Sequence, residues 1–327
     1  MSNAFEAPPV SRNPFVADRT IRLRQERLAA SVGTAIGVEI AALLSGGKAA
    51  LGRNEGCVLP KQQADALIAR YELTGVEDLM LLALDTARTI ARPPISDFFV
   101  GAVGLETETG NLILGGNVEF PGTHLGFTIH GEGFVFTRAA SRGMTITAIA
   151  IGEAHPCAHC RQYLSEFQAT RDLVLIDPLG HRLTMAELYP WPFDPDYLGE
   201  AGYVPGAMHP DLALGENVLP QIIAERLLAA GQRAHAPYSK CPGAVVLALN
   251  DGNTVSGFSI ESVAFNPTMG PLQAAMIDLI AHGYAASDIA EAALTTRIGG
   301  NVDYSLSVTE LLGKLAPSAP LSIVGWA

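Results

Sequence analysis

Three residues near the middle of the 327-residue chain have the types and spacing that suit a metal ion. His130 is followed by Cys157 and Cys160, and a proline lies directly before the first cysteine. An imidazole nitrogen and two thiolates suit Zn²⁺, and cysteines separated by two residues can both reach one ion from the start of a helix. Three protein ligands leave the fourth tetrahedral position open. This pattern is typical of a catalytic zinc site rather than a structural one.

Glu132 adds a titratable group to this set. It lies two residues beyond His130, close to the ion but not expected to bind it. From there its carboxylate can take a proton from water at the metal and deliver it to a reacting group. Pro156 does not weaken the helix that carries the cysteines, and the positive end of that helix favours ionised thiols. These residues therefore predict acid–base chemistry beside a zinc ion.

Two other interpretations of the cysteine pair stay open. The pair can be a redox centre, although that leaves His130 and Glu132 unexplained. It can also belong to a closed structural zinc site with four protein ligands. The candidates for the fourth ligand of such a site are His155, His159 and Cys241.

The metal motif falls within an alternation of strands and helices. We expect strands over 98–105 and 111–115, a helix over 131–141, a strand over 145–151, a helix over 156–167 and a strand over 173–176. Strands alternating with helices imply a layered α/β sheet. His130 then lies just before one helix, and the cysteines lie at the start of the next.

The rest of the chain divides into further sections. Residues 1–57 are expected to form a loosely ordered lead-in over 1–14 and a helical section, in which Gly46-Gly47 ends the helix that begins near residue 18. The catalytic domain is expected over 58–189. Six prolines between 190 and 220 predict a long ordered linker, and a second domain follows over 221–327.

The second domain repeats the order of features in the first. Ser96 precedes Glu119 by 23 residues, and Ser239 precedes Glu261 by 22, with a strand and a turn between them in both cases. Near-equal spacing of the same elements indicates a duplicated domain. In place of the metal motif the second copy has only Pro-Leu-Gln-Ala at 271–274, and no cysteine follows. We therefore expect one zinc ion per chain and a second copy without catalytic chemistry.

These motifs resemble those of the cytidine deaminases, specifically the two-copy dimeric class of bacteria. The H-x-E…P-C-x-x-C arrangement matches a known signature of zinc-dependent nucleobase deaminases. The resemblance implies a three-layer α/β/α sheet of the cytidine deaminase type, duplicated, with an N-terminal helical section. It runs from about residue 58 to the C-terminus and rests on segments 96–98, 116–120, 128–132, 156–162, 237–240 and 264–268.

The resemblance also implies an activity and a set of site residues. The activity is the hydrolytic deamination of cytidine and 2′-deoxycytidine with release of ammonia, as in pyrimidine salvage. Zinc is held by His130, Cys157 and Cys160, and Glu132 is the proton shuttle. Substrate contacts are expected from Asn117, Val118 and Glu119 at the ribose, and from Phe98 and Phe193 at the pyrimidine. In this class the enzyme is a homodimer, and the silent copy completes the partner's active site, with segment 264–268 as the expected contributor.

Three positions depart from the family pattern, namely Gly131, His155 and Phe99, where Ala, Thr and a polar residue are usual. Without a methyl group, Gly131 is consistent with a wider pocket beside the leaving amine, or with neutral drift in which Phe99 or His155 fills the space. One alternative function is therefore the deamination of an N4-substituted cytosine nucleoside. Another, from a different class, is a zinc-stabilised nucleoside-binding protein without catalysis.

Composition excludes several partners. The chain has 21 Lys and Arg against 33 Asp and Glu, a net charge of −12, which disfavours a nucleic-acid surface. Four cysteines are too few for a disulfide scaffold, and we expect Cys57 and Cys241 to be small apolar residues. The most apolar early stretch, 32–44, is interrupted by Glu39 and is shorter than the ~20 residues of a membrane span. We therefore expect a cytoplasmic protein.

Overall fold

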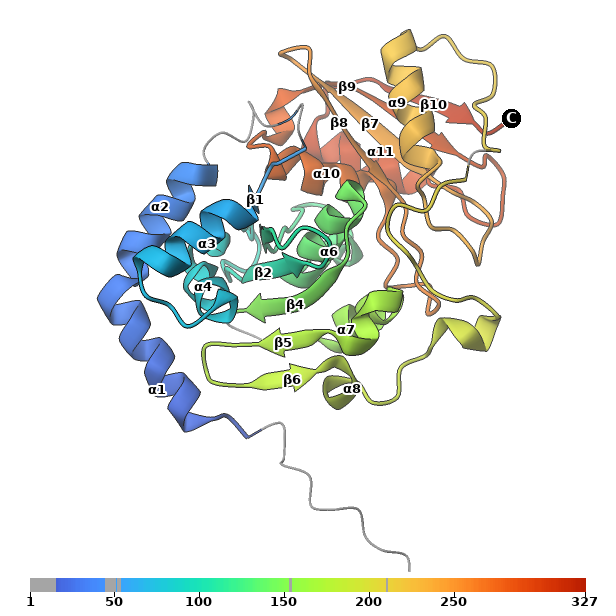
Figure 1. Ribbon diagram of the computed structural model, residues 1–327. Coiled ribbons are helices and arrows are strands. Elements are labelled where there is room, and N and C mark those ends of the chain that lie inside the picture. Colours follow the sequence, from blue (N-terminus) through green and yellow to red (C-terminus); the bar gives the residue numbers. More distant parts are fainter. Residues whose placement is uncertain (1–15, 45–50, 52–53, 153–154, 210) are drawn as a thin grey trace, which may run out of the picture.

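The computed structural model describes residues 16–44, 51, 54–152, 155–209 and 211–327. The expected lead-in over 1–14 and the expected helix stop at Gly46-Gly47 lie outside the described residues. The ribbon in Figure 1 shows an N-terminal helix along one side, a first sheet in the middle and a second sheet beside it.

The N-terminal helix runs without a break from α1 (Arg19–Leu28) through a π-helical turn, η1 (Ala29–Gly33), to α2 (Thr34–Leu44). Asp18 caps its start by accepting a hydrogen bond from the Thr20 N–H. Ile36 and Ile40 are fully buried where α2 packs against the first domain. Among the described residues, this helix alone has the length and composition to cross a membrane. It is 26 residues long, whereas the apolar stretch considered from the sequence, 32–44, is only its C-terminal half.

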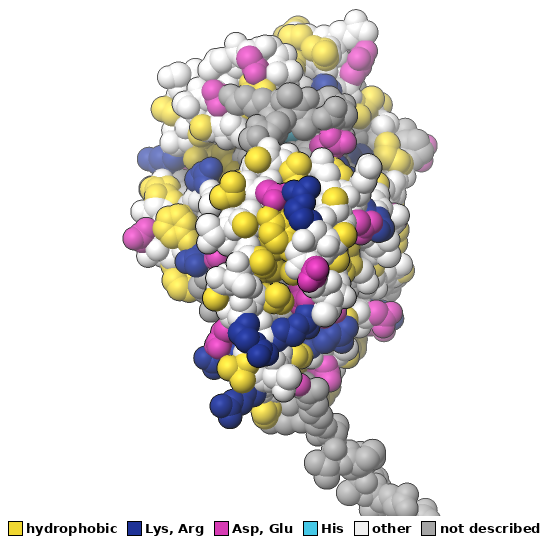
Figure 2. Space-filling model, turned by 60° about the vertical axis from the view of Figure 1, so that its left-hand side comes forward, with side chains coloured by type: hydrophobic (Ala, Val, Ile, Leu, Met, Phe, Trp, Pro, Cys, Tyr) yellow, Lys and Arg dark blue, Asp and Glu magenta, His cyan; other side chains and the backbone are white. Residues whose placement is uncertain are grey.

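The composition of α1 gives this helix a strongly basic end. Four arginines lie within its ten residues. Figure 2, which brings this side of the molecule forward, shows Lys and Arg side chains gathered near the point where the chain leaves toward the N-terminus. Charged side chains are costly inside a bilayer. Together with the packing of Ile36 and Ile40 against the first domain, these charges disfavour a membrane span, although only 11% of the apolar window of the helix is buried.

The first sheet has six strands in the order β1-β3-β2-β4-β5-β6. Within it β2 pairs antiparallel with both β3 and β4, and β4 pairs parallel with β5. The strands are β1 (Val58–Leu59), β2 (Gly101–Glu106), β3 (Leu112–Gly116), β4 (Ile146–Ile151), β5 (Val174–Ile176) and β6 (Arg182–Thr184). This matches the expected strands, apart from the short edge strands β1 and β6 and the later start of β2.

Alternating side chains of this sheet enter two cores, as a strand period of two requires. In β4, for example, Ala148 and Ala150 pack on one face, whereas Ile149 and Ile151 pack on the other. One face is covered by α2, α3 (Lys61–Arg70), α4 (Val76–Leu82) and α5 (Leu84–Arg88), and the other by α6 (Gly131–Arg142) and α7 (Ala158–Ser165). The result is the expected three-layer α/β/α arrangement.

The second sheet repeats the central part of the first. Its order, β10-β9-β7-β8, corresponds to β5-β4-β2-β3, with the same antiparallel and parallel pairings. A register shift recurs at the equivalent end of both central strands, at Leu105/Glu106 in β2 and Ala248/Leu249 in β7. The elements are β7 (Ala244–Leu249), β8 (Thr254–Phe258), β9 (Ile289–Thr296), β10 (Leu321–Gly325), α9 (Gln221–Gly231), α10 (Pro271–Ala281) and α11 (Ser305–Leu315).

The two sheets meet through equivalent helices, because α6 packs against α10 (Figure 1). The Arg138 guanidinium on α6 is fully buried and lies 3.0 Å from the Asp278 carboxylate on α10. Short elements connect the rest: η3 (Leu125–Phe127), η4 (Gln168–Asp172), α8 (Met185–Leu188), η5 (Pro195–Leu198) and η6 (Ala286–Asp288). Between α8 and α9 the described chain has one helical turn, η5, and buries Tyr203 against Phe167 at a ring distance of 5.3 Å.

Candidate active site

The starts of two helices bring the metal motif together. His130 is the N-cap of α6 and Cys157 is the N-cap of α7, and both have extended backbone. The His130 Nδ1 atom lies 3.5 Å from the Cys157 Sγ atom and 3.2 Å from the Cys160 Sγ atom. A tetrahedral zinc ion would separate its nitrogen and sulfur ligands by about 3.6 Å. The three side chains therefore fit a zinc ion with little movement.

The other candidate ligands for a closed site have different partners. The His159 Nε2 atom lies 3.3 Å from the Asn266 carbonyl oxygen. The buried Cys241 thiol donates to the Ser239 carbonyl oxygen, and the His155 Nε2 atom lies 2.9 Å from the Asp177 carboxylate. None of these contacts points to the His130 group. The structure therefore supports the open, three-ligand interpretation.

The two cysteines of the group have opposite proton affinities. Hydrogen bonds from the Cys160 thiol and from His130 lower the pKa of Cys157 to about 3. The neighbouring Cys157 thiolate and burial both raise the pKa of Cys160. Contact with Cys157 also raises the pKa of His130. A dication in this position would favour the deprotonated form of all three groups, which is how metal ligands bind.

Glu132 lies in the first turn of α6 and is 4% exposed. Its burial raises the pKa of this carboxyl group, which suits a group that must both accept and donate a proton. It borders a cavity of about 390 Å³. The residues around this cavity are Ser96, Phe98, Val100, Asn117, Glu119, Thr128, His130, Gly131, Glu132, His155 and Cys157.

Asn117 and Glu119 form part of the cavity wall and fix a loop beside it. Asn117 accepts a hydrogen bond from the Val100 N–H and donates one to the Phe98 carbonyl, each 2.9 Å long. Glu119 accepts bonds of 2.9 Å from the Ile95 and Ser96 N–H groups and of 2.5 Å from the Ser96 hydroxyl. Burial alone would raise the pKa of Glu119, but these hydrogen bonds outweigh it and lower the pKa.

The remaining predicted substrate residues differ in position. Phe98 lines the cavity and is 51% exposed. Val118 is buried, and its backbone pairs with Ile129 just before the metal motif. Phe193 is not among the residues that line the cavity, since its ring stacks on Tyr197 at 5.5 Å. Its backbone is bonded to the Gln162 side chain of α7 at 2.7 and 3.1 Å.

The Ser96–Glu119 arrangement is a structural clasp that sequence reasoning missed. In the second copy Glu261 accepts bonds from the Tyr238 and Ser239 N–H groups and from the Ser239 hydroxyl, in the same pattern. The signal was available, because the near-equal Ser-to-Glu spacing that revealed the duplication is the spacing of this clasp. The clasp therefore belongs to the fold, and the first copy uses it to shape the cavity.

In the described part of the second copy, a tyrosine fills the place that corresponds to the cavity. Tyr304 is the N-cap of α11, as Cys157 is the N-cap of α7, and it is 8% exposed. Gly243 corresponds to Val100 of the cavity wall, because its N–H donates to Ser259 as the Val100 N–H donates to Asn117. A methyl group at Gly243 would lie 2.5 Å from the Tyr304 ring. The tyrosine ring therefore occupies the position of the catalytic cavity.

Gly131 does not widen the cavity in the expected way. A methyl group at this residue would lie 3.2 Å from the Ala102 side chain and 3.7 Å from the Val100 side chain. The missing group thus faces strand β2 and the residue before it. The expectation of extra space beside the leaving amine is therefore not supported, because close packing of α6 on β2 explains the glycine.

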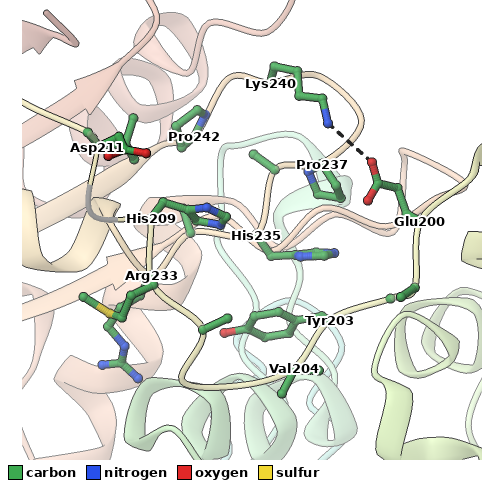
Figure 3. A pocket seen from close by; sticks show the side chains of 17 residues that line it. Glu200, Tyr203, Val204, His209, Asp211, Arg233, His235, Pro237, Lys240 and Pro242 are labelled. Atoms are coloured by element: carbon green, nitrogen blue, oxygen red, sulfur yellow. Dashed lines mark hydrogen bonds and ion pairs between the residues drawn. The ribbon is translucent and has the colours of Figure 1, made fainter.

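A larger cavity of about 730 Å³ lies between the 200–212 segment and the second copy (Figure 3). Lys240 and Glu200 form an ion pair of 3.3 Å at its edge. The Arg233 guanidinium points away from the cavity and donates to the Ala140 and Ser141 carbonyls of α6. Within the described residues, neither group that could hold a metal ion lies here. Chemistry rather than size identifies the site at His130.

A duplicated α/β/α fold with an open His-Cys-Cys group beside a buried glutamate defines the class of zinc-dependent deaminases. The chain matches the family described as "Cytidine and deoxycytidylate deaminase zinc-binding region" twice, over residues 74–176 and 186–307. Cytidine deaminase 6 of Arabidopsis thaliana is 34% identical over 78% of this chain and 94% of its own length. The chain belongs to the cytidine and deoxycytidylate deaminase family, and zinc is its cofactor.

Other similar proteins come from bacteria. Cytidine deaminase of Photobacterium profundum is 33% identical over 83% of this chain and 90% of its own length. The crystal structure of cytidine deaminase from Mycobacterium leprae is 30% identical with a TM-score of 0.32 and covers 35% of this chain and 98% of its own.

Proposed function

We propose that the protein catalyses the hydrolytic deamination of cytidine and 2′-deoxycytidine to the uridine forms with release of ammonia. The observation that carries this proposal is the position of Glu132, buried beside the open His130, Cys157 and Cys160 group at a cavity. A non-catalytic binding protein has no need of this buried carboxylate.

The reaction adds water at C4 of the pyrimidine and removes the C4 amine. Zinc held by His130, Cys157 and Cys160 supplies Lewis acidity, which makes the attacking water more acidic. Glu132 takes one proton from that water and delivers it to N3. It then takes the second proton, from the hydroxyl added at C4, and delivers it to the departing amine as the C4–N bond breaks. Its raised pKa lets it hold the proton between these transfers. The buried position of Glu132 keeps bulk water from competing for the proton.

We propose that Asn117 and Glu119, with Val118 between them, bind the ribose, and that Phe98 and Phe193 contact the pyrimidine. The first two side chains have acceptor and donor groups for sugar hydroxyls. Phe98 already lines the cavity. Phe193 would reach the base after a movement of the 191–198 segment, whose aromatic side chains are exposed. The acidic net charge of the chain supports a free nucleoside as substrate. The free cysteines support a reducing, cytoplasmic location.

We further propose that the active form is a homodimer of two-copy chains, with domains over 58–189 and 221–327. Phe265 in segment 264–268 is 63% exposed, and Phe98 beside the cavity is also exposed. Within one chain, the carbonyl of Asn266 in the same segment contacts His159, which places the segment beside the zinc cysteines of its own chain. Exposed apolar residues next to a site support completion by a second chain.

A spectrophotometric assay with cytidine, together with metal analysis, tests the proposal. We expect loss of the cytidine absorbance with release of ammonia, and zinc bound at the catalytic group. Cys157→Ala should lose both zinc and turnover, whereas Cys241→Ala, which alters a buried cysteine outside the group, should retain both. A zinc-loaded protein that leaves cytidine and deoxycytidine unchanged would contradict the proposal.

A further inference from the structure

A second group of possible metal ligands lies beside the catalytic cavity. His155 lies in the loop between β4 and α7, Asp177 follows β5, and His181 precedes β6. The Asp177 Oδ2 atom lies 2.9 Å from the His155 Nε2 atom and 2.7 Å from the His181 Nδ1 atom. The two imidazole rings are 5.0 Å apart, edge to face. Within the described residues, only this group and the catalytic one have ligand atoms close enough for a shared ion.

We propose that His155, Asp177 and His181 form a second binding site for a divalent transition-metal ion of the zinc class. Two imidazole nitrogens and one carboxylate oxygen are a donor set that binds zinc, cobalt and iron. A tetrahedral ion would separate these donors by about 3.4 Å, so each histidine nitrogen must move about half an ångström or slightly more away from the Asp177 oxygen. His155 can supply this movement because its side chain is 41% exposed.

The carboxylate is oriented for this role by backbone donors. The other oxygen of Asp177, Oδ1, accepts hydrogen bonds from the Leu179 N–H at 3.0 Å and the His181 N–H at 2.9 Å. Those bonds leave Oδ2 directed at both histidines. Outer-sphere hydrogen bonds of this kind fix a ligand before the metal arrives. Asp177 is 4% exposed, so a cation here would also neutralise a buried charge.

The turn that carries His181 is rigidly supported. Gly180 has a φ of +95°, and a methyl group there would lie 2.4 Å from the Asp18 carbonyl oxygen. The Gly180 carbonyl also accepts a hydrogen bond of 2.9 Å from the Asp18 N–H, at the start of α1. Two of the three ligands thus lie on a turn packed against the N-terminal helix. Only His155 is on a separate loop.

The second site is distinct from the catalytic one but adjacent to it. His155 lines the catalytic cavity and lies two residues before the zinc ligand Cys157. An ion at the second site ties this loop to the turn between β5 and β6. The chain would then bind two metal ions, rather than the one zinc ion expected from the sequence.

Cobalt titration of enzyme that carries one equivalent of zinc, which the thiolate site takes first, separates the two sites, because cobalt bound by thiolates has a charge-transfer band in the near ultraviolet. We expect the wild-type protein to bind one equivalent of Co²⁺ with visible d–d bands and without the thiolate band. His181→Ala and Asp177→Asn should weaken this binding by at least ~10–100-fold. His124→Ala removes an exposed histidine outside both groups and should bind cobalt as the wild type does.

Zinc content and a thermal melt of each variant show that the fold and the catalytic site are intact. The proposal is overturned if the zinc-loaded wild type takes up no cobalt below millimolar concentration. It is also overturned if His181→Ala takes up cobalt as well as the wild type, since the ion then binds elsewhere. Appearance of the thiolate band would show exchange at the cysteines instead, and would overturn it too. These outcomes are independent of cytidine turnover, so they do not depend on the proposed function.

Discussion

Glu132 shows how one residue acquires its role from its position. His130 has extended backbone and is the N-cap of α6, and Glu132 lies in the first turn of that helix. Glu132 is therefore buried close to the metal ligand and borders the cavity. We expect Glu132→Gln to retain zinc and substrate binding but to lose turnover by about 10²–10⁴-fold or more, because an amide accepts no proton. Equilibrium binding and steady-state kinetics measure the two effects. Near-normal kcat in this variant would exclude Glu132 as the shuttle.

Gly131 is expected to affect the stability of the protein but not its substrate preference. Because an added methyl group would press on Ala102, we expect Gly131→Ala to lower the melting temperature modestly. The ratio of kcat/KM for cytidine to that for an N4-alkyl cytidine should stay the same. A thermal melt and paired kinetics measure both quantities. A clear fall in the relative rate on the alkyl substrate would restore the idea of a pocket widened by glycine.

At the scale of residues, sequence reasoning found what lies close together along the chain. His130, Cys157 and Cys160 lie at the starts of two helices, and their residue types and their match to a known signature indicate a shared ion. The position of Phe193 depends on how an irregular segment packs, which no local pattern specifies. The cluster at Asp177 was missed because His155 lies on a separate loop, which meets the turn carrying Asp177 and His181 only in the folded sheet.

At the scale of elements, the repeated Ser–Glu clasp provides its own control. Glu119→Gln and Glu261→Gln each weaken the same set of hydrogen bonds in one copy. We expect both variants to lose melting temperature, whereas only Glu119→Gln raises KM for cytidine, because only the first clasp borders the cavity. Parallel melts and kinetics test this. Equal kinetic damage from both variants would mean that Glu119 acts only through the fold.

The contact between α6 and α10 depends on one buried ion pair. Burial alone would raise the pKa of Asp278, but a hydrogen bond from His282 and the charge of Arg138 lower it. Asp278 therefore contributes stability above its unfolded pKa of about 3.9, and that contribution is lost as the pH falls through its lower folded value. We expect Asp278→Asn to cost about 3–5 kcal/mol in the free energy of unfolding at neutral pH, because it leaves Arg138 buried without a charged partner.

Denaturant unfolding of wild type and Asp278→Asn between neutral and acidic pH measures this prediction. The difference in stability between the two proteins should shrink as the pH falls. A constant difference would show that the ion pair is not the cause. Arg22→Gln, which removes an exposed ion pair on α1, serves as the control and should change stability little.

Element boundaries differed from expectation where side chains compete with strand pairing. The sequence predicts a strand from residue 98, but β2 begins at Gly101. Asp97 has a φ of +53°, and Asn117 bonds to both Phe98 and Val100. These side-chain bonds replace the ladder bonds that a strand would make. This replacement of ladder bonds depends on Asn117, which is distant in the sequence, so the periodicity of residues 98–105 could not reveal it.

At the scale of the whole molecule, the homodimer proposal predicts complementation between two defective chains. Glu132→Gln lacks the shuttle but keeps segment 264–268, and Phe265→Ala has the reverse defect. If each site uses the partner's segment, one of the two sites in a mixed dimer is complete. Refolding an equal mixture should then restore about a quarter of wild-type activity, since half of randomly formed dimers are mixed. Activity no higher than the average of the separate variants would show that each chain uses its own segment.

Tyr304 in the second copy bears on how the two halves of the chain diverged. A duplicate that loses its metal ligands also loses the folding free energy that the metal supplies. The tyrosine ring replaces that contribution with packed apolar area in the vacated space. No single reversion recovers a metal site: a cysteine at position 304 would remove the ring, but the second copy would still lack the histidine and the other cysteine. With its cavity filled, the second copy has a structural role only. Its contribution to the protein lies in its surfaces and its packing.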